Sequence, residues 1–317
     1  MPRRKRLTWP RALDLFCDHL TARNARPLTL KGYRAVLERF WAQYGRAHAP
    51  RGPADVTLAH LREYQVGLFT GATAPSGRPL SAQTVSQTTT ALTALFRFLA
   101  AEDLIPRDPT RRLEQPKTPP RPPGVVLSVK EVHRLLAAAD TTTPYGLRDR
   151  AALELLYATG LRRGELLALD LADVDHTERE LTVREGKGGK GRVLPITRSA
   201  YLALEAYLER GRSAFAGFKA PTTHLLLVRG GRPMGPAALK KTVARLAAAA
   251  GIPKRATPHC LRRSFATHLL QGGASLRHIQ VLLGHASLQT TATYLCLDRS
   301  ELRHEILLRH PREQLDV

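Results

Sequence analysis

The chain has 317 residues, and with 43% hydrophobic and 24% charged residues it has the length and composition of a globular protein of two domains. Its net charge of +22 at pH 7 indicates a polyanionic partner, and charge alone leaves DNA, RNA and an anionic membrane surface open. No apolar run reaches the ~18 residues of a membrane span, and the basic first residues lack the apolar segment of a secretory signal, so we expect a cytoplasmic protein without a membrane span. Three scattered cysteines, Cys17, Cys260 and Cys296, fit a reducing compartment and match no zinc-site spacing.

Residues 7–113 are predicted to be helical throughout. One amphipathic helix is predicted to end at Gly45, and another to begin at Ser81. The first repeats apolar residues at helical spacing, at Tyr33, Val36, Leu37, Phe40, Trp41 and Tyr44. The second is predicted to bury Val85, Leu92, Leu95, Phe96 and Leu99. Its other face carries hydroxyl and amide groups that can bond phosphates or base edges, although a solvated face would have the same composition. These candidate DNA contacts are Gln83, Ser86, Gln87, Thr88 and Thr90.

A proline-rich segment separates this half of the chain from the rest. Residues 114–126 contain five prolines, a composition that disfavours helix and favours an extended, semi-rigid chain. We therefore predict a linker at 114–126, between a first domain at 7–113 and a second domain at 127–317.

The second domain opens with helices. Ser128 and Glu131 form a capping box, and the largely apolar helix that follows is closed by Gly160. Arg162 comes directly afterwards, next to a new helix start, where it can be held rigidly. Its neighbour, Arg163, is the alternative, and an isolated surface charge would look the same in sequence.

A glycine-rich β-hairpin follows these helices. Its strands are predicted at Leu181–Arg184 and Arg192–Ile196, with Lys187 and Lys190 near the tip. The glycines are followed neither by a Lys-Ser/Thr pair nor directly by a helix, which excludes a P-loop. A third strand is predicted within residues 224–234, so the sheet is small.

The most informative stretch lies near the C-terminal end. Thr257 caps a helix whose first turn carries His259 and Arg262 on one face. A helix N-terminus that also presents an imidazole and a guanidinium favours an anion such as phosphate. A second short helix stops just before His285, and a third is predicted to carry Tyr294.

These motifs, taken in order, resemble the tyrosine recombinase (phage integrase) family. The segments that carry the resemblance read ATGLR-x-x-E, GKG, HCLR and LGH, and a tyrosine follows nine residues after the last of them. A lone His-x-x-Arg is weak evidence, whereas the ordered set is strong. The resemblance covers roughly residues 7–312, and it implies the catalytic residues Arg162, Lys187, His259, Arg262, His285 and Tyr294. It also implies that Glu165 is the carboxylate partner of Arg162. The GKG motif aligns Lys187, and Lys190 remains the alternative.

The fold implied by this resemblance is mainly α. It comprises an all-helical core-binding domain and a mixed α/β catalytic domain with a small three-stranded sheet, which together form a C-shaped clamp around DNA. The implied chemistry is transfer of a phosphodiester to Tyr294, which gives a 3′-phosphotyrosyl link. The arginines would offset phosphate charge, His259 would act as the base, Lys187 would protonate the leaving 5′ oxygen, and His285 would hydrogen-bond the phosphate. With cations this dense, we expect no metal and no cofactor.

The C-terminal tail resembles that of Xer-type recombinases. A helix is predicted with Asp298 as its cap and only Leu302 and Ile306 as an apolar edge, which is too narrow for firm packing on its own domain. Docking on a neighbouring protomer is therefore expected, as in Xer-type enzymes, where this helix is exchanged between subunits. We expect a homo- or hetero-tetramer on double-stranded DNA, acting at a specific site in the nucleoid.

The favoured function is a Xer-like site-specific recombinase that resolves DNA dimers, and three others remain open. A mobile-element integrase or transposase of the same family would show the same motifs. A type IB-like topoisomerase would share the chemistry but would act as a monomer, which leaves the tail helix unexplained. A DNA-binding regulator without enzymatic activity would have no use for a positioned phenol at Tyr294.

Overall fold

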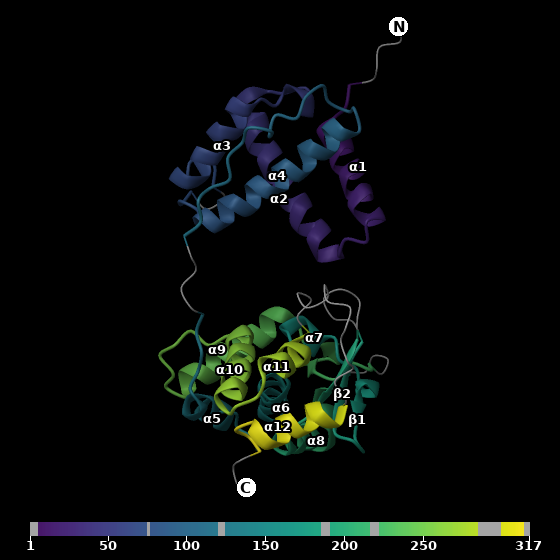
Figure 1. Cartoon of the computed structure of the whole chain (residues 1–317), viewed down its shortest axis with the longest axis vertical. Helices are drawn as coiled ribbons and strands as arrows, with labels where there is room; N and C mark the ends of the chain where they lie inside the picture. The colour runs from purple at the N-terminus through teal and green to yellow at the C-terminus, as the bar shows by residue number, and fades with distance from the viewer. Residues whose placement is uncertain are drawn as a thin grey trace. The chain divides into compact units, whose positions relative to one another are not determined.

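The computed structural model describes residues 6–74, 77–119, 124–184, 191–215, 222–284 and 299–313. The chain forms two compact units, Met1–Arg121 and Pro122–Val317, and the division falls inside the proline-rich segment (Figure 1). Each unit has a hydrophobic core of its own. None of the helices in the described ranges is both long enough and apolar enough to cross a membrane.

The described part of the first unit is built from helices around an aromatic core. These are α1 (Trp9–Ala22), α2 (Pro27–His48), α3 (Leu58–Thr70) and α4 (Ala82–Ala101), with a short 3-10 turn, η1 (Pro53–Asp55), between α2 and α3. Trp9 of α1 stacks on Trp41 of α2, with ring centroids 4.4 Å apart, and Phe40 meets Tyr64 of α3 edge to face. Aromatic pairs of this kind add to the stabilisation that comes from burying apolar area alone.

The start of α4 is confirmed, whereas the predicted end of α2 is wrong. The hydroxyl of Ser81 accepts the backbone N–H of Thr84, so Ser81 is the N-cap of α4. Helix α2 does not stop at Gly45, because it continues to His48 and ends at Ala49, which has a left-handed conformation. A glycine inside a helix costs only about 1 kcal/mol, and the preceding Tyr44 is buried in the core, so packing carries the helix past the glycine.

The polar face of α4 is smaller than predicted. Gln87 and Thr90 are exposed, and Gln83 and Ser86 are partly exposed. Thr88 is only 6% exposed, and its hydroxyl donates to the carbonyl oxygen of Thr84 at 3.1 Å. The placement of Thr88 on the open face is therefore wrong. It lies three residues after Val85 and four before Leu92, and helical periodicity puts it on the buried side with them.

The second unit is arranged around one central helix, α6 (Pro144–Thr159) (Figure 1). The helices placed around it are α5 (Val129–Ala137), α7 (Arg163–Leu167), α8 (Arg198–Arg210), α9 (Pro236–Ala249), α10 (Pro258–Gln271), α11 (Leu276–Leu283) and α12 (Arg299–Arg309), with 3-10 turns η2 (Leu171–Asp173) and η3 (Arg212–Phe215). Between Gly146 and Thr159, helix α6 is buried at every residue except the partly exposed Arg150, as its mostly apolar sequence predicts, and α8 and α10 pack on it. Gly160 ends it with a positive φ of 62°, where a side chain would strike Phe265, so the turn toward Arg162 needs glycine.

The predicted mainly helical fold with a small three-stranded sheet is confirmed, but one strand was assigned wrongly. The sheet has the order β1 (Val174–Asp175), β2 (Glu180–Val183) and β3 (Arg192–Pro195), with antiparallel pairing that sets Leu181 opposite Leu194. The predicted third strand instead forms β4 (Leu227–Val228), which pairs with β5 (Arg232–Pro233) in a separate hairpin. The two glycines between β4 and β5, both at positive φ, turn this segment back on itself.

The tail helix α12 packs on its own unit, so the prediction that it lacks a local partner is wrong. Ile306 is fully buried in the main core, and His310 is fully buried beside the carbonyl oxygen of Tyr157. Arg312 donates to both carboxylate oxygens of the buried Glu154, at 2.6 and 3.2 Å. The apolar edge alone underestimates this contact, because the polar His310 and Arg312 after it also pack on the unit.

Candidate active site

Arg162 and Glu165 form the first part of the candidate site. Arg162 is the N-cap of α7, and Glu165 occupies the third position of the same helix. The carboxylate accepts the backbone N–H of Arg162 at 2.8 Å and its guanidinium at 2.7 Å. Burial alone would raise the pKa of Glu165, but hydrogen bonds from Arg192 and Arg162 outweigh it and lower the pKa to about 2. Glu165 is therefore a fixed anion at neutral pH, as the predicted pairing with Arg162 requires.

Arg262 comes from the first turn of α10 and reaches the same place. Thr257 caps this helix as predicted, since its hydroxyl accepts the backbone N–H of Cys260. The guanidinium of Arg262 is 6% exposed and donates to the carbonyl oxygen of Gly160 at 2.6 Å. Burial, with repulsion from Arg162, lowers the pKa of Arg262 to about 10, so it remains charged at pH 7. Two positive groups are thus held close together at a cost that an anionic ligand would offset.

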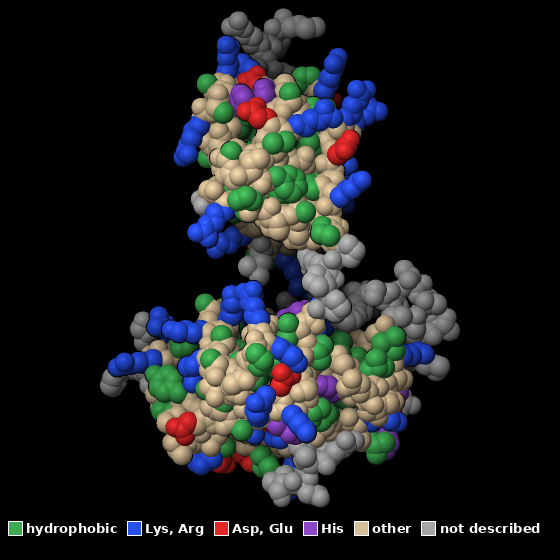
Figure 2. Space-filling model, turned by 90° about the vertical axis from the view of Figure 1, so that its left-hand side faces the viewer, with side chains coloured by type: hydrophobic (Ala, Val, Ile, Leu, Met, Phe, Trp, Pro, Cys, Tyr) green, Lys and Arg blue, Asp and Glu red, His purple; other side chains and the backbone are tan. Residues whose placement is uncertain are grey.

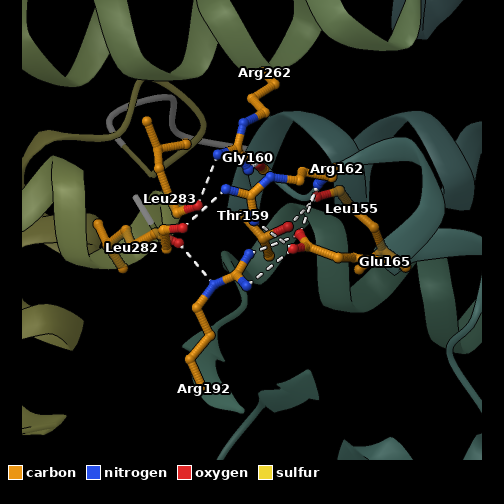
Figure 3. A network of polar contacts seen from close by, with 10 residues as sticks. Leu155, Thr159, Gly160, Arg162, Glu165, Arg192, Arg262, Leu282 and Leu283 are labelled. Atoms are coloured by element: carbon orange, nitrogen blue, oxygen red, sulfur yellow. Dashed lines mark hydrogen bonds and ion pairs between the residues drawn. The ribbon is translucent and has the colours of Figure 1, made fainter. Parts of the chain in front are cut away.

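The C-terminal end of α11 holds both of these arginines (Figure 3). Arg262 donates to the carbonyl oxygen of Leu283 at 2.7 Å, and Arg162 donates to that of Gly284 at 2.8 Å. The last carbonyls of a helix have no partner within it and carry partial negative charge. They therefore orient the guanidiniums before any phosphate is bound. Gly284 ends the helix at a φ of 61°, which confirms the predicted helix stop.

His259 lies one residue into α10, beside Arg262. Its side chain is exposed, so it is accessible to a ligand. Partial burial of the ring, followed by the charges of Arg263 and Arg262, lowers the pKa of His259. The ring is therefore neutral at pH 7, the state in which one of its nitrogens can accept a proton.

These residues border a cleft of about 670 Å³. Its cationic lining comprises Arg162, Arg163, Lys240, Arg255 and Arg262, with His259 beside them. Such a lining concentrates anions. Figure 2 shows more generally that Lys and Arg far outnumber Asp and Glu on one face of each unit.

The structure brings four of the predicted site residues together: Arg162, Glu165, His259 and Arg262. Arg163 lines the same cleft, and it is Arg162 that Glu165 holds. The predicted Lys187, Lys190, His285 and Tyr294 lie outside the described residues. In the parts of the second unit that are described, no three His, Cys, Asp or Glu side chains converge as a metal-binding group.

Sequence reasoning missed three basic residues of the site. Arg255 stands two residues before the cap of α10, where a cation beside an anion-binding helix start could have been noticed. Lys240, in the middle of α9, gave no signal in the sequence. Arg192 pairs with Glu165 through both of its terminal nitrogens. It lies 27 residues after Glu165 in the sequence, where the pattern indicates only the start of a strand.

Comparison with known proteins identifies related chains. The phage integrase family profile matches residues 125–301. The chain is 43% identical to tyrosine recombinase XerC 2 of Ralstonia nicotianae over 288 residues, 89% of this chain and 80% of the relative. It is 40% identical to tyrosine recombinase XerD of Mycobacterium tuberculosis over 309 residues, 95% of this chain and 97% of the relative. Tyrosine recombinase XerC of Oceanobacillus iheyensis is 35% identical over 303 residues, with 95% and 96% covered.

Solved structures share the fold at lower identity. A Tn1549 transposon integrase in complex with circular intermediate DNA has a TM-score of 0.66 and 22% identity, and the match covers 95% of this chain and 99% of that one. A lambda integrase dimer bound to a COC′ core site has a TM-score of 0.65 and 21% identity, with 92% and 100% covered. At this level of identity the likeness concerns the fold.

Proposed function

This chain belongs to the phage integrase family and is a Xer-like site-specific recombinase, and we propose that it breaks and rejoins double-stranded DNA through a 3′-phosphotyrosyl intermediate on Tyr294. The observation that supports this mechanism best is the pair of guanidiniums of Arg162 and Arg262, which are fixed by helix-end carbonyls beside one cationic cleft. A phosphodiester resists nucleophilic attack because its oxygens are negatively charged. Two preorganised guanidiniums offset that charge as it increases in the transition state.

The proposed reaction divides proton transfer between two residues. The phenol of Tyr294 loses its proton to the neutral His259 as its oxygen attacks phosphorus. The bond from phosphorus to the 5′ oxygen breaks, and Lys187 supplies the proton that this oxygen needs. His285 hydrogen-bonds the phosphate. The covalent link keeps the energy of the phosphodiester, so a 5′ hydroxyl from the partner duplex can reverse the step and complete the exchange.

A substitution at Tyr294 tests this proposal. With a suicide substrate from the native locus, the wild-type chain is expected to form a protein–DNA adduct that survives SDS. Tyr294→Phe should bind the same DNA with unchanged affinity and form no adduct, because the attacking oxygen is absent. Tyr145→Phe is the matched control, since this side chain is 50% exposed and packs its ring on Phe215. An adduct formed by Tyr294→Phe would contradict the assignment of the nucleophile.

We also propose that the protein assembles as a homo- or hetero-tetramer on DNA and exchanges α12 between protomers. Exchange would replace the contacts of Ile306, His310 and Arg312 with the same contacts made by a neighbouring helix on the same surface, so little stability need be lost. A chain ending after Asp298 that circular dichroism shows to be folded should bind a single half-site but fill paired half-sites without cooperativity. Normal cooperativity in gel shifts, together with normal recombination, would exclude exchange.

We further propose a role in resolving chromosome dimers in the nucleoid, which the resemblance to Xer-type recombinases implies. A role on a mobile element would instead require a DNA target site at the ends of that element. Mapping the cut made at the native locus decides between them, because a chromosomal resolution site lies outside any element, whereas an integrase cuts at the element's own ends.

A further inference from the structure

We propose that Arg192 is a positioning residue for strand cleavage: it holds Glu165 so that Arg162 faces the scissile phosphate instead of folding onto the carboxylate. The inference rests on the proposed function, because it concerns how the phosphate of that reaction is held. Arg192 is the first residue of β3 and follows Lys187 by five residues in the sequence. It therefore links the hairpin to the phosphate-binding arginines.

All three nitrogens of the Arg192 guanidinium donate hydrogen bonds, which fix the orientation of the side chain. Its side chain is 12% exposed. Nη1 donates to Oε1 of Glu165 at 3.1 Å, and Nη2 donates to Oε2 at 2.8 Å, so the two planar groups meet as a fork. The third donor, Nε, bonds the carbonyl oxygen of Leu282 at 3.0 Å. No orientation of a lysine could make these three contacts at once.

The fork determines how Arg162 can bind the same carboxylate. Arg162 reaches only Oε1 of Glu165 with its guanidinium, through Nη1, and its Nη2 turns to the carbonyl oxygen of Gly284 (Figure 3). If Arg192 were removed, Oε2 of Glu165 would keep only the backbone N–H of Arg162 as a donor, and the carboxylate could turn so that both of its oxygens meet the guanidinium of Arg162. The guanidinium of Arg162 would then turn toward Glu165 and away from the cleft.

The carbonyl oxygens at the C-terminal end of α11 bind Arg192 together with the two phosphate-binding arginines. Its consecutive carbonyls at Leu282, Leu283 and Gly284 each accept from a different arginine, namely Arg192, Arg262 and Arg162 in that order. A Cβ on Gly284 would lie 3.1 Å from Nη1 of Arg192, which is tighter than nine in ten real Cβ contacts. Arg192 therefore packs against the turn from which the chain runs on to His285 and Tyr294.

Arg184, which follows the neighbouring strand β2, provides a matched control. It is also ion-paired, with Asp170 at 2.6 Å and Asp173 at 2.7 Å through Nη2. Among the described residues, these pairs fix the hairpin base and do not involve Glu165. Arg184→Gln therefore removes a guanidinium from the same hairpin without touching the pair that holds Arg162.

The experiment uses the full chain with suicide substrates from the native locus. One substrate has the natural phosphate at the cut site, and the other has a methylphosphonate, in which a methyl group replaces one charged oxygen. The neutral substrate needs less charge compensation, so a defect in presenting Arg162 should matter less on it. Arg162→Ala should slow cleavage of the natural substrate by ~10²–10³-fold and that of the methylphosphonate much less. Arg192→Gln should show the same pattern at ~10–100-fold, the size typical of losing a residue that orients a catalytic group.

Three outcomes would overturn the inference. Equal slowing of Arg192→Gln on both substrates would indicate a folding or hairpin defect. The same substrate-dependent loss in Arg184→Gln would assign the effect to the hairpin as a whole. Full activity of Arg192→Lys would show that charge without the fork is sufficient. Half-site affinity of the Arg192 variants should stay within about twofold of wild type, because the guanidinium of Arg192 is largely buried and already paired. Failure of the wild-type chain to cleave either substrate would instead count against the proposed function.

Discussion

Lowering the pH is expected to destabilise the second unit through His310, which is fully buried behind α12. Nε2 of this ring lies 3.1 Å from the carbonyl oxygen of Tyr157, and Nδ1 accepts the backbone N–H of Arg312 at 3.1 Å. Only the neutral ring with its proton on Nε2 satisfies both contacts, because a proton on Nδ1 would face a donor. Burial, reinforced by the positive charge of Arg312, lowers the pKa of His310 to about 3.

The size of the effect follows from the difference between the folded and unfolded pKa. Below its ordinary pKa of ~6.5, an unfolded histidine binds a proton that folded His310 does not, so acid favours unfolding. The contribution of neutral His310 to the free energy of unfolding is complete above pH ~6.5 and is lost as the pH falls toward 3. Lowering the pH from 7 to 5 should therefore cost about 2 kcal/mol. Burial also lowers the pKa of His268 and His133, and both add to the loss in the same direction.

Urea denaturation at pH 7, 6 and 5 can measure this loss for the second unit separately. The two tryptophans, Trp9 and Trp41, belong to the first unit, so their fluorescence reports its unfolding, whereas circular dichroism reports both transitions. The comparison variant is His310→Gln, whose amide remains neutral in this range. Its second transition should lose about 2 kcal/mol less than wild type between pH 7 and 5. Parallel pH dependence in the two proteins would refute the buried neutral histidine as the cause.

Other predictions concern the cleft and the tail. Arg162→Ala and Arg262→Ala should each slow adduct formation by ~10²–10³-fold with little change in half-site affinity, whereas Arg163→Ala should be much milder; comparable losses at all three would show that only general charge matters. Addition of EDTA should leave adduct formation unchanged, and inhibition that added metal reverses would contradict catalysis by cationic side chains alone. Ile306→Ala should lower the unfolding free energy of the second unit by about 2–5 kcal/mol, and Leu307→Ala, at a position 44% exposed, by far less; similar values would mean that α12 is not docked as described.

The sequence predicted the parts of the site that depend on local spacing. Thr257 caps α10, as its place before the helix predicts, and Arg162 meets Glu165 three residues later, as the ATGLR-x-x-E motif implies. The pairing of Arg192 with Glu165 could not be read in this way, since it depends on how the sheet packs beside α7. The carbonyl oxygens at the end of α11 have no signature in sequence at all, because every residue has a carbonyl and only the fold decides which one is free.

The tail and α4 show a second limit of sequence reasoning, which counts apolar residues to judge burial. At α12 this count found a narrow edge and missed that the polar His310 is buried with its hydrogen bonds satisfied. At α4 it placed Thr88 with the exposed polar residues, although its hydroxyl is satisfied by the preceding turn of the helix. In both cases a polar group is buried because a backbone partner removes the cost of leaving water.

The arrangement of charges around Glu165 suggests why the site contains more arginine than the phosphate needs. Three guanidiniums, of Arg162, Arg192 and Arg262, surround a single described carboxylate, and their repulsion contributes to the lowered pKa of Arg262. Carbonyl oxygens at the end of α11 offset part of that repulsion without adding a full negative charge that would compete with DNA. A phosphate entering the cleft supplies the missing charge and should raise the pKa of Arg262 again. Contacts with the surrounding DNA would then hold the phosphate between the guanidiniums, where the reaction develops negative charge. Interactions that strengthen in the transition state accelerate the chemical step as well as binding the substrate.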